Sequence, residues 1–201
     1  MVMGTRGIFG FIKNGEDKLT YNHWDSYPDG LGRNIIEFIN RHSVEKLNDT
    51  FNKIVLVHEN NPPTEQQIQI CIKNGLADFS VSTREKADWY CLLRNCQGNL
   101  DLLVSMEDEA YMLDNHNFIK DSAFCEYGYI INLDDNVLEY WEGFQHDPDP
   151  SNRYGTEPYE GYKNTYYPCK LINTFSFEQL NDVDTIIELM NGKENDDIIG
   201  F

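Results

Sequence analysis

The dipeptide Asn14-Gly15 constrains the fold of this chain more than any other feature, because it stands between two runs of β-forming residues. Asn-Gly between two apolar runs is the strongest short-range signal for a β-hairpin. We therefore predict one strand over about residues 5–13, where Ile8 and Phe11 favour β-structure, and its partner over about residues 18–24. Three glycines in the first run discourage a helix there.

Side chains that can bind or react gather near one end of this hairpin. Arg6 offers a planar fork suited to phosphate or carboxylate, His23 can exchange a proton near neutral pH, and Asp25 can orient the histidine or act as a base. The ring of Tyr27 can stack on a flat ligand. With residues from later segments included, the predicted ligand-binding residues are Thr5, Arg6, His23, Asp25, Tyr27, Glu126 and Gln145.

A purely structural role is the alternative for each of these residues. Asp25 would then cap a turn, Arg6 would pair with a buried carboxylate such as Glu126, and His23 would form a hydrogen bond in the core. We favour a binding site, because several suitable side chains are clustered within one short stretch.

Thr5 allows a further interpretation. An opening of the type G-T-x-G-I resembles the N-terminal-nucleophile hydrolases, in which cleavage before the threonine frees its amine as the base. We expect a related sheet architecture without this self-cleavage, because the chain retains the residues before Thr5.

Two segments of the opening stretch also resemble a family. A start of the form G-T-R-G, followed by Y-N-H-W-D-S-Y-P-D-G-L-G at residues 21–32, is similar to uncharacterised proteins of phages, fungi and other microbes. Segments similar to F-C-E-Y-G-Y-I-I-N-L-D, E-Y-W-E-G-F-Q and Y-Y-P-C-K-L recur in that family. No agreed activity belongs to it, so the resemblance implies a shared site and no named reaction.

The length and composition indicate one cytoplasmic globular domain. A chain of 201 residues with 40% hydrophobic residues can bury one good core, so we predict a single domain over residues 1–201. Residues 1–6 lack the apolar core of a signal peptide, and no run is long enough to span a membrane. Five cysteines without a C-x-x-C pair are typical of packing residues in a reducing compartment.

The charge of the chain excludes one class of partner. Its formal net charge is -18, from 34 acidic and 16 basic residues. Such a surface repels the phosphate backbone of DNA or RNA, so no direct nucleic-acid binding is expected. Solubility explains the acidity more simply than mimicry of DNA, because the acids are scattered in twos and threes.

Periodicity and capping signals predict the remaining elements. Helices are expected at about 34–40, from Ser43 to a well-buried end at Ile54–Val57, from Thr64 to about 74, and at 183–190. A capping box at residues 82–85 predicts another helix, which either continues past Gly98 or breaks there. Further strands are predicted at about 111–113, 126–133, 137–141 and 166–173.

Two segments stand outside these elements. Residues 146–164 form a long loop or lid, in which Arg153, Tyr154, Tyr159 and Tyr162 can fold over a ligand. Residues 193–201 form a polar, frayed tail.

These observations predict a single-domain α+β fold in which a mixed, largely antiparallel sheet packs against helices. The leading functional hypothesis is the binding of a phosphate-bearing, nucleotide-like molecule, for example a host immune signal sequestered by a phage protein. The first alternative is a hydrolase with His23 as general acid or base and Asp25 as its orienter, and the second is an acidic interaction protein or DNA mimic. The histidines form no metal-binding pattern, so neither metal nor cofactor is predicted, and a homo-oligomer stays open.

Overall fold

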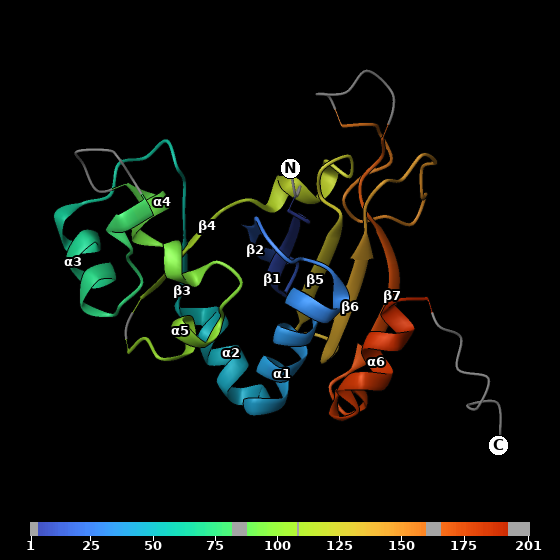
Figure 1. Ribbon diagram of the computed structural model, residues 1–201, viewed down its shortest axis with the longest axis horizontal. Coiled ribbons are helices and arrows are strands. Elements are labelled where there is room, and N and C mark those ends of the chain that lie inside the picture. Colours follow the sequence, from blue (N-terminus) through green and yellow to red (C-terminus); the bar gives the residue numbers. More distant parts are fainter. Residues whose placement is uncertain (1–3, 82–87, 108, 160–165, 193–201) are drawn as a thin grey trace.

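A five-stranded mixed sheet forms the centre of the computed structural model, which describes residues 4–81, 88–107, 109–159 and 166–192 (Figure 1). Its strands are β1 (Gly7–Lys13), β2 (Glu16–Asn22), β5 (Tyr127–Asn132), β6 (Val137–Glu142) and β7 (Lys170–Ser176). They are ordered β2-β1-β5-β6-β7, with β1 and β5 parallel and the other neighbours antiparallel. The predicted α+β fold with a mixed, largely antiparallel sheet is confirmed.

The N-terminal hairpin forms where Asn14-Gly15 predicts it. Lys13 pairs with Glu16, so the loop has two residues, and both have positive φ, 52° for Asn14 and 74° for Gly15. A two-residue loop of this kind has a twist that matches the twist of the two strands. The second hairpin pairs Asn132 with Val137 across the predicted Asp-Asp-Asn turn.

The helices follow the predicted capping signals where the structure describes them. They are α1 (Arg33–Arg41), α2 (Val44–Lys53), α3 (Glu65–Lys73), α4 (Trp89–Leu92), α5 (Asp101–Val104) and α6 (Val183–Met190). The side chain of Ser43 accepts a hydrogen bond from the backbone N of Lys46 (3.2 Å), and Thr64 forms a capping box with Gln67. These bonds satisfy backbone donors that the first turn of a helix leaves free.

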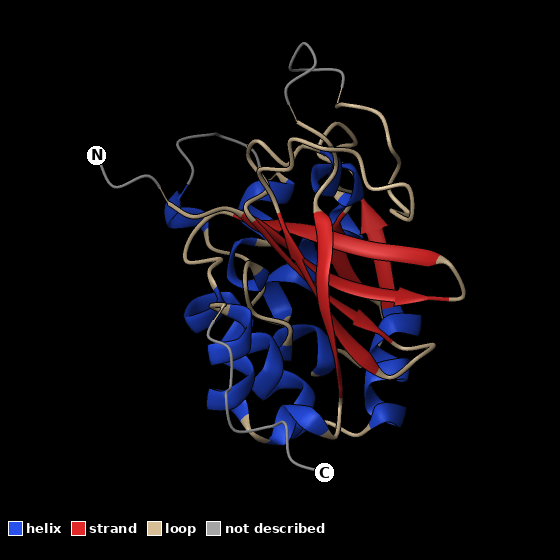
Figure 2. Ribbon diagram, turned by 90° about the vertical axis from the view of Figure 1, so that its right-hand side faces the viewer, coloured by secondary structure: helices blue, strands red, loops and turns tan. Residues whose placement is uncertain are grey.

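The two faces of the sheet are covered differently. Phe9, Phe11 and Tyr129 point to the helical side, where one continuous cluster of buried side chains extends to residues of α1, α2, α4 and α6. Figure 2 shows the helices gathered on this side of the sheet. Ile8 and Trp141 point to the other side, where loop residues cover them. Both faces of the sheet are therefore buried.

An ion pair fixes the long loop on the second face. Both nitrogens of the Arg153 fork donate to the carboxylate of Glu139, at 2.8 and 2.6 Å, and the guanidinium also lies over the rings of Trp141 and Tyr154, 4.8 Å from each centroid. Asn132 and Trp141 donate further hydrogen bonds to the same carboxylate. Arg153 and Tyr154 thus hold this part of the predicted long loop or lid against the sheet.

A second, two-stranded parallel sheet corrects one prediction. It pairs β3 (Ile54–Val57) with β4 (Ala110–Leu113), so the predicted buried end of the second helix is a strand. The ammonium of the buried Lys18 donates to the carbonyls of Phe51 and Ile54, at 3.0 and 2.7 Å. These bonds occupy carbonyls that a continued helix would use, so the helix ends here. A hydrogen bond from Asn115 N to Leu19 O (2.9 Å) attaches the end of this small sheet to β2.

Other predicted boundaries also move. The helix predicted to continue past Gly98 or to break there is broken. The short helices α4 and α5 lie on either side of Gly98, which has a φ of 68°. The last strand starts at Lys170, after Pro168, rather than at residue 166. The predicted capping box at 82–85, Tyr162 and the tail at 193–201 lie outside the described residues. Among the helices described, none has the length and apolar character needed to cross a bilayer.

Candidate functional site

Three neighbouring cavities line up along β2 and the residues that follow it. The central cavity, of about 400 Å³, lies between β2, β4 and the segment from Trp89 to Gln97. A second cavity of about 420 Å³, which we call the Arg6 cavity, shares Tyr21 and Asn115 with it. A third, of about 620 Å³, shares Trp24, Arg94 and Gln97. The stretch from Thr20 to Tyr27 therefore contributes to all three cavities.

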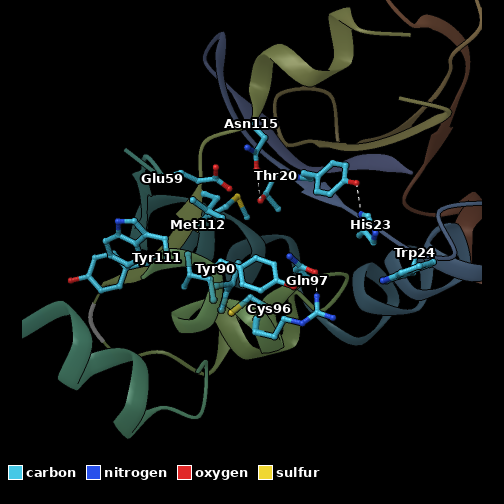
Figure 3. A pocket seen from close by; sticks show the side chains of 16 residues that line it. Thr20, His23, Trp24, Glu59, Tyr90, Cys96, Gln97, Tyr111, Met112 and Asn115 are labelled. Atoms are coloured by element: carbon cyan, nitrogen blue, oxygen red, sulfur yellow. Dashed lines mark hydrogen bonds between the residues drawn. The ribbon is translucent and has the colours of Figure 1, made fainter. Parts of the chain in front are cut away.

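The central cavity combines aromatic faces with a few polar groups. Figure 3 shows His23 and Trp24 on one side of it and Glu59 on the other. Trp24 and Tyr90 are exposed by 50% and 42%, so part of each ring is accessible to a ligand. Glu59 is the one carboxylate among the described residues of its lining.

A hydrogen bond determines what His23 offers to the central cavity. The Tyr21 hydroxyl lies 2.6 Å from His23 Nδ1. Burial raises the pKa of Tyr21, against the opposing charge of Arg6, so its hydroxyl stays protonated and can donate. A neutral histidine that accepts this bond at Nδ1 has its proton on Nε2. In that tautomer, His23 presents an Nε2–H donor to the cavity that it lines.

Arg94 provides a positive charge where the central and third cavities meet. Its guanidinium lies over the ring of Tyr90, 5.7 Å from the centroid, and donates to the side chain of Gln97. Arg94 and Gln97 both line the central and the third cavity. The contacts with Tyr90 and Gln97 hold the guanidinium at the cavity wall.

Cys96 lines the central cavity but is unsuited to nucleophilic chemistry. Burial, with a smaller contribution from Cys71, raises the pKa of its thiol to about 12. A thiol is nucleophilic in its ionised form, so Cys96 is unreactive near neutral pH. All five cysteines are free, in agreement with their predicted role as packing residues.

The Arg6 cavity contains a carboxylate oxygen without a partner. Its lining consists of Arg6, Tyr21, Asn115, Phe118, Asp121 and Phe124. The Arg6 guanidinium lies 4.5 Å from the ring centroid of Phe124, and its backbone N donates to Glu126 Oε1 at 3.1 Å. Within the described residues, the buried Oδ1 of Asp121 accepts no hydrogen bond.

The turn after β2 places Asp25 and Tyr27 in the third cavity instead. Asp25 has a φ of 53°, and its carbonyl accepts a hydrogen bond from Leu31 N at 2.8 Å. A side chain at Gly30 would lie 2.2 Å from that carbonyl, so glycine is required for the close approach. The partner found for His23 is Tyr21, and no hydrogen bond between His23 and Asp25 exists in the described part of the chain.

The remaining predicted residues have structural contacts. Thr5 O accepts a hydrogen bond from Ser26 N, at 3.2 Å. The side chain of Gln145 donates to the carbonyls of Glu142 and Gly143, at 3.2 and 2.8 Å, and so stabilises the turn after β6. The structure therefore brings Arg6 and His23 to adjacent cavities through Tyr21, places Asp25 and Tyr27 in the third, and leaves Thr5, Glu126 and Gln145 outside these linings.

Sequence reasoning missed several residues of the site. The missed side chains are Tyr21, Trp24, Glu59, Tyr90, Asn115 and Asp121. An aromatic residue next to a candidate histidine is a signal that could have found Tyr21 and Trp24. The others come from distant segments that the chain folds against β2, and no local pattern marks them.

Neither a search for metal-binding clusters nor comparison with known proteins assigns a ligand to these cavities. Over residues 4–81, 88–107, 109–159 and 166–192, no group of three or more His, Cys, Asp or Glu side chains is placed to hold a metal ion. Comparison of the chain with family models, with characterised proteins and with solved structures gave no match.

Proposed function

We propose that this protein binds a small phosphate-bearing molecule of the nucleotide type, with its phosphate in the central cavity. The carrying observation is that this cavity, in a chain of net charge -18, brings the Arg94 guanidinium and the His23 ring together with exposed aromatic side chains. Arginine forks and neutral N–H donors are the groups that bind phosphate oxygens.

The other groups of the central cavity fit the rest of such a ligand. Tyr90 and Trp24 provide apolar faces on which a sugar or ring can pack. Glu59 lies across the cavity from His23 and can accept hydrogen bonds from sugar hydroxyls (Figure 3). The volume of about 400 Å³ is within the range of about 300–1,000 Å³ typical of small-molecule sites.

Binding without hydrolysis is the better-supported activity. A general base needs a free nitrogen lone pair, and in the tautomer that accepts from Tyr21 the neutral His23 has none. Cys96 is a neutral thiol, and Asp25 faces the third cavity rather than the histidine. These contacts support donors that hold a ligand, and they leave Glu59 as the one candidate base in the described lining of the cavity.

We expect the Arg94→Ala variant to bind nucleoside monophosphates about 10- to 100-fold more weakly than the wild type, since a hydrogen bond to a charged group contributes about 1.5–3 kcal/mol. Thermal unfolding with AMP and GMP, with the ligand analysed by mass spectrometry afterwards, measures this. A ligand present at about 100 times its dissociation constant adds roughly 2.7 kcal/mol of stability, a clear rise in the midpoint.

Arg41→Ala is the matched control, because Arg41 forms an exposed ion pair with Asp101 and lines neither of the two cavities that contain Arg94. It should bind nucleotides as the wild type does. A wild-type protein that no nucleotide stabilises would refute the proposed function, and recovery of a dephosphorylated product would replace it with the hydrolase alternative.

A further inference from the structure

The Arg6 cavity lies directly beside the proposed phosphate site. Tyr21 and Asn115 line both cavities, so the two cavities adjoin at these two residues. The other lining residues come from the start of β1 and from the segment between β4 and β5. Three of the six residues that line the Arg6 cavity are aromatic: Tyr21, Phe118 and Phe124. The ring of Phe118 meets that of Tyr21 edge-on, at 4.9 Å between centroids.

Asp121 leaves a hydrogen-bond acceptor unused in this cavity. Its Oδ1 is buried and has no hydrogen-bond partner within the described residues. Burial raises the pKa of this carboxyl, and the nearby charge of Arg6 opposes the rise. A buried acceptor without a partner costs about 1–3 kcal/mol, and such groups in native proteins often have a functional reason. This oxygen is closed to solvent in the structure, so a ligand N–H donor would reach it once the carboxyl turns toward the cavity.

Arg6 offers the complementary group. Its guanidinium is held over the ring of Phe124 and makes no hydrogen bond in the part of the chain that the structure describes. It lies close enough to Asp121 to affect the ionisation of that carboxyl. The cavity therefore has N–H donors and a carboxylate acceptor side by side, next to aromatic rings.

We propose that the Arg6 cavity is a base subsite that selects guanine, with Arg6 donating to O6 and N7 and Asp121 accepting from N1–H and N2–H. Guanine has two acceptors on one edge and two donors on the adjacent edge, and a planar arginine fork to O6 and N7 is the commonest specific contact to this base. Adenine has an amino donor in place of O6 and no N1–H, so it cannot satisfy both residues.

This inference rests on the proposed function, because it assigns the base of the same nucleotide whose phosphate lies near Arg94. It assigns two parts of the ligand to two residues, and each residue can be tested separately. Arg94 contacts the part that all nucleotides share, and Asp121 contacts the part that differs between them.

The experiment compares GMP and AMP binding by isothermal titration calorimetry in the wild type, Asp121→Asn and Asp147→Asn. The wild type should bind GMP about 5- to 150-fold more tightly than AMP, because a good bidentate pair discriminates by about 1–3 kcal/mol. Asp121→Asn should lose most of this preference and keep its AMP affinity. Asp147→Asn removes the same charge from an exposed position and should keep the preference.

A second measurement separates a ligand contact from a structural role. Since Asp121 has an unused buried acceptor, Asp121→Asn should unfold at the same or a higher temperature than the wild type without ligand. Equal GMP and AMP affinities in the wild type would overturn the base subsite and leave the phosphate site intact. A preference for GMP that survives in Asp121→Asn would also overturn it, and an absence of any nucleotide binding would overturn both proposals.

Discussion

Replacing Arg153 by alanine should lower the free energy of unfolding by about 3–5 kcal/mol, because it leaves a buried carboxylate without its cation. The side chain of Glu139 is 4% exposed and that of Arg153 is 32% exposed, so the carboxylate depends mainly on protein donors, of which the guanidinium is the charged one. The variant also loses the contacts of the guanidinium with Trp141 and Tyr154. Urea unfolding followed by tryptophan fluorescence measures the effect, and Trp141 reports directly on the changed site.

The exposed pair of Arg41 and Asp101 provides the comparison. Its side chains are 50% and 46% exposed, and its shortest N to O distance is 2.7 Å. Exposed ion pairs contribute about 0–1 kcal/mol, so Arg41→Ala should cost no more than that. If the two variants lose equal stability, burial of Glu139 is not the cause, and the long loop is held by other contacts.

Replacing Gly10 by alanine should destabilise the protein by about 3 kcal/mol or more, because strained backbone and a clash coincide there. Gly10 has a φ of 147°, and a Cβ added to it would lie 2.1 Å from the carbonyl oxygen of Lys18 on β2. Relief of this clash requires β1 and β2 to separate. Circular dichroism during thermal unfolding should show a markedly lower midpoint.

Gly15→Ala is the matched substitution within the same hairpin. Gly15 has a φ of 74°, and a Cβ there meets nothing within 4 Å. Its cost is the left-handed backbone alone, about 1–2 kcal/mol. A Gly10→Ala variant as stable as Gly15→Ala would show that the strand pair tolerates the displacement and that the close approach is unimportant.

Much of the fold could be predicted from the sequence because its signals are local. Asn14-Gly15 set the first hairpin, Ser43 and Thr64 started helices, and alternation in the second hairpin gave β5 and β6. The run Ile54–Val57 misled because four aliphatic residues after a helix fit either a buried helix end or a strand. Its partner strand lies more than fifty residues later, and no local pattern announces that pairing.

The candidate site was predicted less completely for the same reason. His23 and Arg6 were found because they stand in a conspicuous short stretch, and both line cavities. Tyr90, Arg94 and Asp121 reach those cavities by tertiary folding. Asn22 and Ser26, within the same motif, are buried and hydrogen-bond each other at 2.8 Å, so part of that motif maintains the turn. A sequence pattern does not separate such structural residues from those that line the cavities.

The parallel pairing of β1 with β5 has a consequence for the order in which the chain can fold during synthesis. Gly7 pairs with Tyr127, so β1 cannot form this pairing until a strand 120 residues later has been synthesised. At about 5–20 residues per second, a ribosome takes about 6–24 seconds to add that length. An isolated hairpin is at best marginally stable, and an unpaired apolar strand edge invites aggregation. In the nascent protein, the edge of β1 is therefore protected by a chaperone or by early packing of helices until residue 132 has left the ribosome.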